Sequence, residues 1–385
     1  MPGHARTGGR DVIFAWEQCK LKNKAEIVRG ASPRPISNPK WFDDNSNVGW
    51  LRISDVTEQK GRIHHLSQRI SKAGQSKTRV ITEPHLLLSI AATVGSPVIN
   101  YVNTGVHDGF LIFLNPTFDK EFMFQWLLMF KPYWNKYGQP GSQVNLNSDI
   151  VGNQSVAFPT TSEQERIGSF FRKLDRTITL HEEKKRQLER LKSALMQKMF
   201  ADKSGYPPVR FEGFSNEWEH CKLGDVADIT TGSRNHQDSV TDGKYPFFVR
   251  SDKVERLNEY DFDTKAILVP GDGRIGEIFH YYNGKFALHQ RVYKVDNFNG
   301  INELFLLGLF KYSFKEHALR LNAQGTVPSL RLPMFTNWSI SVPMITEQER
   351  IGGFFQKLER TISLYDHKLE LLKKVKRSML QAMFI

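Results

Sequence analysis

The sequence predicts an α+β fold in which a compact mixed domain followed by one long helix occurs twice. The segment Ser162–Phe200 recurs as Thr346–Phe384 without a gap, and roughly half of the aligned positions are identical. The segment WEQCKL that starts at Trp16 returns as WEHCKL at Trp218. Because a repeat of this length outranks any local motif as evidence of architecture, we interpret the whole chain as a duplication.

The repeated segment is expected to be helical. It contains no proline and is rich in Leu, Met, Gln, Glu, Lys and Arg, which are strong helix formers. Ser162 and Thr346 are the expected N-caps, each followed three residues later by a glutamate, Glu165 or Glu349, that would complete a capping box. At ~1.5 Å per residue, each helix would be about 57 Å long.

Apolar residues recur at a spacing of three and four along both helices, which is the pattern of a heptad seam. His181, Lys185, Lys192 and Lys376 interrupt the stripe. The natural partner for each seam is the other copy. The predicted helix-pair seam comprises Ile167, Phe171, Leu174, Ile178, Leu188, Leu195, Ile351, Phe355, Leu358, Ile362, Leu369 and Leu372.

Between the Trp start and the long helix, both halves keep the same order of segments. An apolar strand is followed by a strand–glycine turn–strand, an apolar helix and a Gly-Ser/Thr segment, which predicts a compact α+β domain. The expected divisions are a disordered segment 1–15, a first domain 16–160, a first long helix 161–201, a linker 202–215, a second domain 216–345 and a second long helix 346–385.

The chain of 385 residues has a formal net charge of +12, so the expected partner is a polyanion. Nucleic acid is the first candidate and an anionic membrane surface the second. No apolar run reaches the ~18 residues that span a bilayer. Two cysteines, Cys19 and Cys221, argue against a disulfide scaffold and suit a reducing cytoplasm. No residue set suggests a metal site.

No catalytic motif is convincing. Gly271–Gly276 has the spacing GxGxxG, but the following residues are β-formers and contain Asn283-Gly284. This pattern predicts a hairpin with its turn at Asn283-Gly284 instead of a nucleotide-binding helix. A phosphate-binding loop and the motif that holds a target amine in amino-methyltransferases are both missing. Two alternatives stay open: a methyltransferase or nuclease with degenerate motifs, and a coiled-coil adaptor without DNA readout.

The favoured hypothesis is DNA contact through polar and basic loop residues that lie beside aromatic residues. Their divergence between otherwise parallel halves suits two modules that read two different sequences. The candidates in the first domain are Ser32, Arg34, Arg52, Lys77, Arg79, Tyr101, Asn103 and His107. In the second domain they are Arg234, Asn235, His236, Arg250, Lys253, Arg274, Tyr281, Lys285, His289, Gln290 and Arg291.

The motif Glu-Gln-Glu-Arg-Ile-Gly is kept at Glu163–Gly168 and Glu347–Gly352. A partner that docks identically on each repeat would explain its retention. With the prolines Pro159 and Pro343, the long helices and the two Trp-x-x-x-Lys-Leu starts, the chain resembles the specificity subunit of type I restriction-modification systems. The two halves differ in the residues that precede these starts, which are VRFEGFSNE before Trp218 and GRDVIFA before Trp16.

The resemblance implies a fold of two pseudo-twofold-related target-recognition domains, separated by two long helices packed as an antiparallel coiled coil. Each domain would read one half of a bipartite double-stranded DNA site in the major groove, and the helix pair would set the spacer. Two methyltransferase subunits and two restriction subunits are the implied partners. S-adenosylmethionine, ATP and Mg would belong to those subunits, and this chain would hold no cofactor and no catalytic residue.

Overall fold

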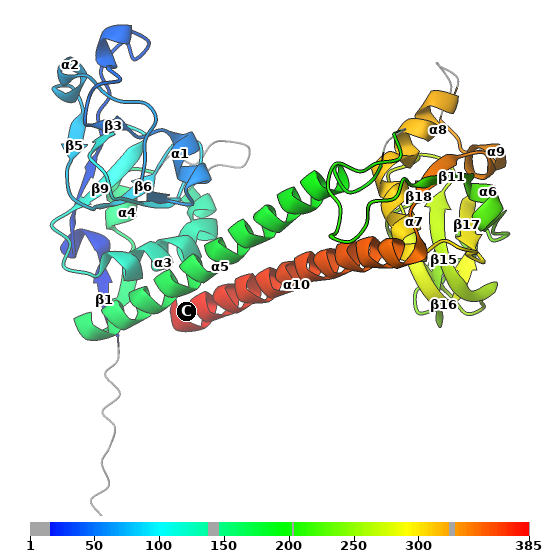
Figure 1. Cartoon of the computed structure of the whole chain (residues 1–385). Helices are drawn as coiled ribbons and strands as arrows, with labels where there is room; N and C mark the ends of the chain where they lie inside the picture. Colours follow the sequence, from blue (N-terminus) through cyan, green and yellow to red (C-terminus); the bar gives the residue numbers. More distant parts are fainter. Residues whose placement is uncertain (1–15, 138–145, 202–203, 323–327, 385) are drawn as a thin grey trace, which may run out of the picture. The chain divides into compact units, whose positions relative to one another are not determined.

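The computed structural model describes residues 16–137, 146–201, 204–322 and 328–384, so the predicted disordered segment 1–15 lies outside the described residues. Contacts divide the chain into two units, residues 1–180 with 369–385 and residues 181–368. Each unit contains one α+β domain together with a portion of both long helices (Figure 1). The α+β class predicted from the sequence is confirmed.

The first unit is built on a five-stranded sheet of order β2-β9-β6-β7-β4, with a three-stranded sheet β3-β8-β5 and a pair β1-β10. The pair joins the Trp16 end of the domain to the strand that enters the long helix. The elements are β1 (Glu17–Lys20), β2 (Glu26–Arg29), β3 (Gly49–Trp50), α1 (Ile53–Glu58), β4 (Arg62–Ile63), α2 (Lys72–Gln75), β5 (Arg79–Ile81), β6 (Leu86–Ser89), β7 (Pro97–Asn100), β8 (Thr104–Val106), β9 (Phe110–Leu114), α3 (Lys120–Phe130), α4 (Ser148–Gly152) and β10 (Ser155–Phe158).

The five-stranded sheet is buried on both faces. Because successive side chains of a strand point to opposite faces, Leu86 and Leu88 of β6 pack with Phe122 of α3, while Leu87 packs with Val56 of α1. This double burial explains why β6 reads as an uninterrupted apolar run.

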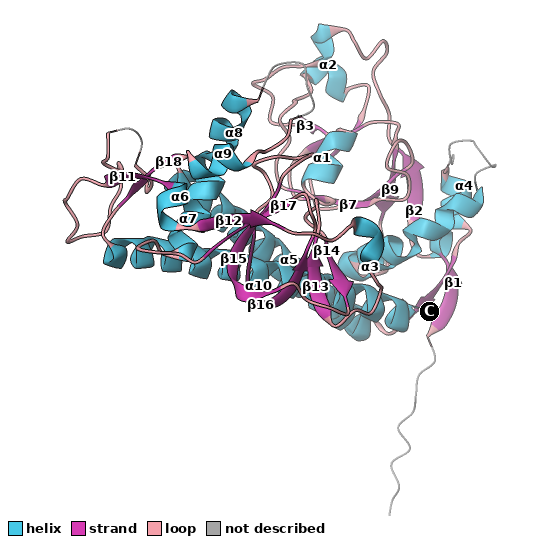
Figure 2. Cartoon of the chain, turned by 90° about the vertical axis from the view of Figure 1, so that its right-hand side faces the viewer, coloured by secondary structure: helices cyan, strands magenta, loops and turns pink. Residues whose placement is uncertain are grey.

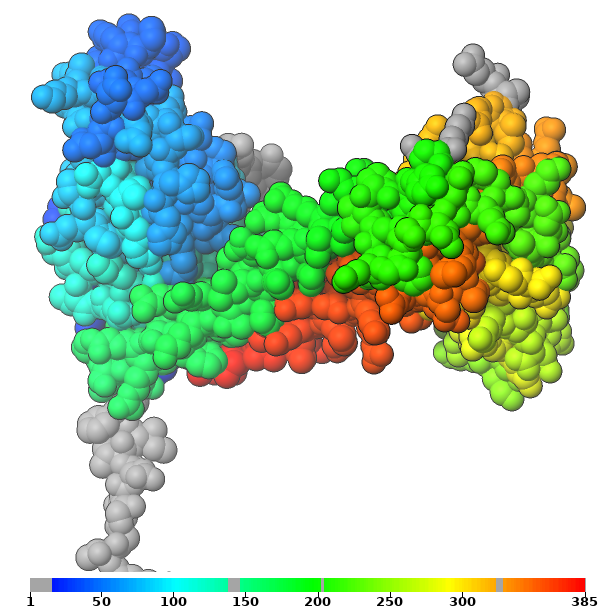
Figure 3. Space-filling model, viewed as in Figure 1, coloured from blue at the N-terminus to red at the C-terminus, as the bar shows by residue number. Residues whose placement is uncertain are grey.

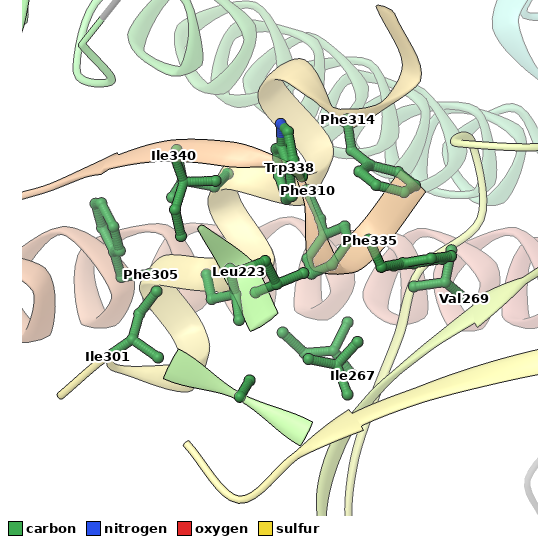
Figure 4. Packing of buried hydrophobic residues seen from close by; sticks show 14 of the residues in the cluster. Leu223, Ile267, Val269, Ile301, Phe305, Phe310, Phe314, Phe335, Trp338 and Ile340 are labelled. Atoms are coloured by element: carbon green, nitrogen blue, oxygen red, sulfur yellow. The ribbon is translucent and has the colours of Figure 1, made fainter. Parts of the chain in front are cut away.

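The second unit has a six-stranded sheet of order β12-β17-β15-β16-β13-β14 and a pair β11-β18 (Figure 2). Its elements are β11 (Glu219–Lys222), α6 (Leu223–Val226), β12 (Asp228–Thr231), β13 (Tyr245–Phe248), β14 (Val254–Leu257), β15 (Phe262–Pro270), β16 (His280–Leu288), β17 (Val292–Asp296), α7 (Glu303–Leu309), a π-helical turn (Phe310–Phe314), α8 (Lys315–Leu321), α9 (Leu332–Thr336) and β18 (Ser339–Val342). Ile267 and Val269 of β15 pack against Phe305, Phe310 and Phe335 in its core (Figure 4).

The predicted turn at Asn283-Gly284 is wrong. Both residues lie inside β16, where Asn283 pairs with Lys265 and Gly284 with Thr264 of β15. The chain reverses instead through residues 271–279, where Gly273 and Gly276 adopt positive φ. The long β15–β16 ladder outweighs the local turn preference of Asn-Gly, so the glycine sits in an extended ladder instead of at a reversal.

The long helices are α5 (Thr161–Met196) and α10 (Ile345–Phe384). The first helix ends at Met196, before the end of the repeated segment at Phe200 and of the predicted helix 161–201. The Phe200 side chain lies instead in the core of the second unit, where it stacks on Phe355. The predicted caps are also wrong. The Glu163 N–H donates to Thr160 Oγ1 at 3.3 Å, and the first-turn amide of Glu347 donates to the carbonyl oxygen of Met344.

The two long helices pack together in antiparallel orientation (Figure 3). In the first unit Lys376 Nζ lies 2.6 Å from Asp175 Oδ1. In the second unit Lys192 Nζ lies 2.6 Å from Glu359 Oε1. Asp175 aligns with Glu359 in the repeat and Lys192 with Lys376, so these are the same contact made twice. The lysines that interrupt the apolar stripe therefore meet acidic partners on the opposite helix.

All twelve predicted seam residues are buried or half-buried. Those nearest the start of each helix, such as Phe171 and Phe355, also belong to the core of the adjoining domain. Near the middle, the His181 ring packs edge-on against Tyr365 and Lys185 forms an ion pair with Asp366 at 2.6 Å.

The repeated motif joins each long helix to its own domain. Gln164 Oε1 accepts from Asp119 N, at the start of α3, and its Nε2 donates to the carbonyl oxygen of Pro159. In the second unit Gln348 makes the same two contacts, with Asn302 N and the carbonyl oxygen of Pro343, both at 2.8 Å. Retention of the glutamine therefore has an explanation inside the domain and needs no docked partner.

Candidate nucleic-acid interface

In each domain, two loops cross and bind each other at one end of the sheet. In the first domain the loop after β2 binds the turn between β8 and β9, because Gly30 N donates to Phe110 O and Ala31 N donates to Val106 O. A Cβ on Gly30 would lie 2.1 Å from the His107 carbonyl oxygen, so only glycine fits this crossing. We call residues 30–34 and 107–109 the first loop pair.

The second domain repeats this crossing with the loop after β12 and the turn between β16 and β17. Gly232 N donates to Val292 O, and a Cβ on Gly232 would lie 2.0 Å from the Leu288 carbonyl oxygen. Residues 232–236 and 289–291 form the second loop pair. Gly30 corresponds to Gly232 in the duplication, so the two loop pairs share one backbone frame.

A histidine holds the turn in both loop pairs. His107 Nδ1 accepts the Gly109 N–H at 2.9 Å, and His289 Nδ1 accepts the Arg291 N–H at 2.9 Å. Burial lowers the pKa of both rings below the ordinary histidine value. Each ring is therefore neutral at pH 7, which leaves Nδ1 free to accept the amide hydrogen.

The tip of the first loop pair is a polar cluster around Asp108. Its carboxylate accepts from Ser32 Oγ at 2.7 Å and from Arg34 Nη2 at 2.6 Å, while its carbonyl oxygen accepts from Arg29 Nε. Burial raises the pKa of Asp108, but the Ser32 hydrogen bond and the charges of Arg34 and Arg29 lower it more, so the net pKa lies below the ordinary value. Asp108 is consequently an anion that orients Arg34.

The tip of the second loop pair carries amides in place of this ion pair. Gln290 Nε2 donates to Asn235 Oδ1 at 2.7 Å, and Gln290 N donates to Arg234 O. The Arg234 guanidinium is bound to Asp261 and Glu259, and these hydrogen bonds raise the pKa of Arg234 above its ordinary value. The same frame thus presents different side chains in the two domains.

The structure places two tyrosine candidates away from the loop pairs. Tyr101 OH donates to Glu121 in the first turn of α3, and Tyr281 OH donates to Glu303 in the first turn of α7. Burial, aided by Glu303, raises the pKa of Tyr281 to about 12. Each tyrosine therefore binds a glutamate in the first turn of its domain helix.

Most of the remaining DNA-contact candidates bind other groups of the same domain. Three arginines are occupied by carboxylates: Arg52 by Asp55, Arg250 by Asp272 and Arg274 by Glu277. His236 lies 3.0 Å from Glu255, Arg79 donates to the carbonyl oxygen of Arg29, and the backbone carbonyl of Asn103 accepts from Gly49. Lys285 lies over the ring of Tyr260.

Lys77, Lys253 and Arg291 are exposed, and their side chains make no ion pair within the described part of the chain. Sequence reasoning missed the acidic partners, above all Asp108 and Asp261. No sequence signal marks them, since each lies far along the chain from the arginine that it binds. Only the fold brings them together.

The described residues contain no group of His, Cys, Asp and Glu that could hold a metal ion. None of the described helices is long and apolar enough to cross a membrane.

Comparison with known proteins gives the same family twice along the chain. The family model for the type I restriction modification DNA specificity domain matches residues 15–190 and again residues 215–374. The type I restriction enzyme EcoDI specificity subunit of Escherichia coli is 28% identical over 169 residues, which cover 43% of this chain and 37% of that protein. The match therefore spans well under half of that relative.

The MjaIX specificity subunit of Methanocaldococcus jannaschii is 20% identical and matches over 95% of this chain and 91% of its own length. The crystal structure of a type I restriction-modification S subunit from M. genitalium has the same fold, with a TM-score of 0.70, 13% identity and 97% coverage of both chains. With the family model matching both halves, this chain belongs to the family of type I restriction-modification DNA specificity proteins.

Proposed function

We propose that this chain is the non-catalytic specificity subunit of a type I restriction-modification complex and that each domain reads one half of a bipartite DNA site. One observation carries the proposal: the two loop pairs share a backbone frame and differ in the side chains at the tip. A shared scaffold with unlike tips suits two readers of two unlike sequences. The net charge of +12 supplies the attraction to phosphates.

The helix pair sets the distance between the two half-sites. Its register is fixed by ion pairs that a slip along the seam would break, Lys376–Asp175 and Lys192–Glu359. Two DNA-reading modules on one face of a duplex need centres about one turn, ~34–36 Å, apart. The helices have 36 and 40 residues and are about 54 and 60 Å long, so they are long enough to span that distance.

Two copies of the methyltransferase subunit dock on the long helices. Outside the seam, one exposed face is identical in both helices and has a spacing of three and four residues. We call it the shared outer face: Lys173, Arg176, Leu180 and Lys184 in α5, and Lys357, Arg360, Leu364 and Lys368 in α10. Its leucines, Leu180 and Leu364, are 54% and 60% exposed. An exposed leucine at the same position of both helices has no packing role within this chain, which favours a contact with a partner.

Restriction subunits join this assembly, and S-adenosylmethionine, ATP and Mg bind to the partner subunits. One solved structure of similar fold, with a TM-score of 0.53, comes from work on complex assembly of the type I R-M system. That resemblance supports the assembly of partners around a chain of this fold.

The DNA-reading function is tested by mapping modified bases in DNA from cells that express this chain with its methyltransferase subunit. A bipartite motif with a fixed spacer is expected. Gel shift of the purified chain at low and high salt addresses the rivals, because an adaptor without DNA readout would bind duplex at neither salt. Methyl transfer from labelled S-adenosylmethionine by the chain alone would favour the enzyme alternative.

Docking is tested separately by Leu180→Asp and Leu364→Asp. Each is expected to weaken capture of the methyltransferase subunit, and the double variant to abolish it, because a buried charge replaces an apolar contact. Leu319→Asp on α8 is the matched control, since Leu319 is 45% exposed and lies outside the shared outer face. Unchanged capture by the double variant would contradict docking on this face.

A further inference from the structure

We propose that the loop pairs are the base-reading elements, with Arg34 on Asp108 reading a guanine in one half-site and Gln290 on Asn235 reading an adenine in the other. The inference rests on the proposed function, because it presupposes that each domain reads a half-site. It goes further by assigning the residues and the bases.

Both tips are held before any DNA arrives. The Gly30 and Gly232 crossings leave no room for a side chain, and each turn is fixed by its histidine Nδ1. Hydrogen bonds tie the two loops of each pair together: Asp108 N donates to Ser32 Oγ in the first pair, and Gln290 N donates to Arg234 O in the second. A reading side chain on such a frame loses little conformational freedom on binding, which favours selective contacts.

In the first loop pair the reading group is the Arg34 guanidinium. Its side chain is 74% exposed, and one of its nitrogens, Nη2, is bound to Asp108 Oδ2 at 2.6 Å. A guanidinium has five N–H donors in a planar fork, so at least one pair of neighbouring donors remains available. Two parallel donors match guanine, which offers O6 and N7 as acceptors in the major groove.

In the second loop pair the reading group is the Gln290 amide. Nε2 carries two hydrogens, and one of them is used by Asn235 Oδ1. The other N–H and the acceptor Oε1 remain on the same exposed amide. One donor beside one acceptor matches adenine, which offers N7 as an acceptor and N6–H as a donor.

The charges around the tips favour bases over phosphates. Asp108 lies at the first tip, and Asp261, Glu259 and Asp272 lie around the second. These carboxylates repel phosphate and neutralise the arginines that they bind. Phosphate contacts instead suit three of the candidates, Lys77, Lys253 and Arg291, which are exposed and have no acidic partner in the described part of the chain.

The test uses the full chain with its methyltransferase subunit, and modified bases are mapped for each variant. Gln290→Glu removes the donor to N7 and leaves two acceptors, which suit the cytosine amino group. We expect the preference for adenine at one position of one half-site to fall roughly 5- to 150-fold and cytosine to gain. Arg34→Lys should weaken the preference for guanine at one position of the other half-site by a similar factor.

Asn283→Ala is the matched control, because Asn283 is an exposed amide on β16 outside the loop pair; its motif should equal that of the wild type. Gln290→Met keeps the side-chain length and removes both polar atoms, so it replaces the glutamate variant if that protein fails to fold.

Three results would overturn the assignment. One is an unchanged motif in the Gln290 variants. Another is an unchanged motif with uniformly weaker modification, which marks a phosphate contact. The third is relaxation at a base other than adenine for Gln290 or guanine for Arg34. A wild-type complex that modifies no bipartite motif would instead contradict the proposed function, so the two failures are distinguishable.

Discussion

Replacement of Gln348 by alanine tests how each long helix is joined to its domain. Gln348 is 1% exposed, and its side chain bonds Asn302 N at 2.8 Å, Pro343 O at 2.8 Å and Gly300 O at 3.3 Å. In Gln348→Ala the Asn302 amide hydrogen and the Pro343 carbonyl oxygen lose their partners. Asn302 caps α7, so the change acts at the start of the helix that fills the core of the second unit.

The expected loss follows from the two orphaned backbone groups. A buried polar group without a partner costs ~1–3 kcal/mol, so two of them cost roughly 2–6 kcal/mol. For a unit of this size a loss of ~3 kcal/mol lowers the midpoint of thermal unfolding by roughly 6–12 °C. Calorimetry is the suitable assay, because the chain has two units and separate transitions can be followed.

The neighbouring residue supplies the control. Glu349 belongs to the same repeated motif but is exposed, so Glu349→Ala should change stability by less than ~0.5 kcal/mol. Gln164→Ala should reproduce the Gln348 effect in the first unit, where the same contacts occur. If Gln348→Ala were as stable as Glu349→Ala, the glutamine would not join the helix to the domain, and a docked partner would again be the better explanation of the motif.

Adjacent glycines give a second test: a Cβ on Gly352 would lie 2.7 Å from the Phe305 backbone nitrogen, whereas one on Gly353 meets nothing within 4 Å. Thermal unfolding should show Gly352→Ala destabilised and Gly353→Ala stabilised by up to ~1 kcal/mol, and the reverse order would refute the close helix approach. The pKa of His289 is lowered in the folded state, so its stabilising effect is present above the unfolded pKa of ~6.5 and lost as pH falls below it. Urea unfolding at pH 7.5 and 5.5 should therefore show a smaller acid-induced loss in His289→Gln, and an equal loss would count against a neutral ring. Asp366→Lys should lower thermal stability by placing two ammonium groups together at Lys185, and Lys185→Glu in the same chain should restore part of it; no recovery in the double variant would argue against this ion pair.

The sequence was sufficient to predict the duplication, the α+β class and the helix pair. Heptad spacing and a gapless repeat depend on residues close together in the chain, so the long helices α5 and α10 are visible without a structure. The apolar runs of β6 and α3 likewise indicated a core. The lysines that interrupt the seam were also visible in the sequence. Their pairing was not, because the aspartate and glutamate side chains that bind them lie on the other helix.

Features that depend on distant pairing could not be predicted in this way. Asn283-Gly284 has the local chemistry of a turn, yet it lies within a ladder set by β15. The repeated glutamine looked like part of a docking motif because the backbone amides that it binds lie about 45 residues away along the chain and cannot be identified from the sequence. Arg34 and Asp108 likewise meet only after the two loops cross.

The most direct measurement of how the helices relate to DNA spacing is the modification motif of a lengthened chain. Seven residues inserted into both helices near the Lys185–Asp366 contact, between Glu183 and Lys184 and between His367 and Lys368, preserve the heptad seam. At ~1.5 Å per residue the pair grows by about 10 Å, which corresponds to about three base pairs. A helix pair that holds the reading domains apart predicts both half-sites unchanged and a spacer about three base pairs longer. The same spacer as in the wild type would contradict that role.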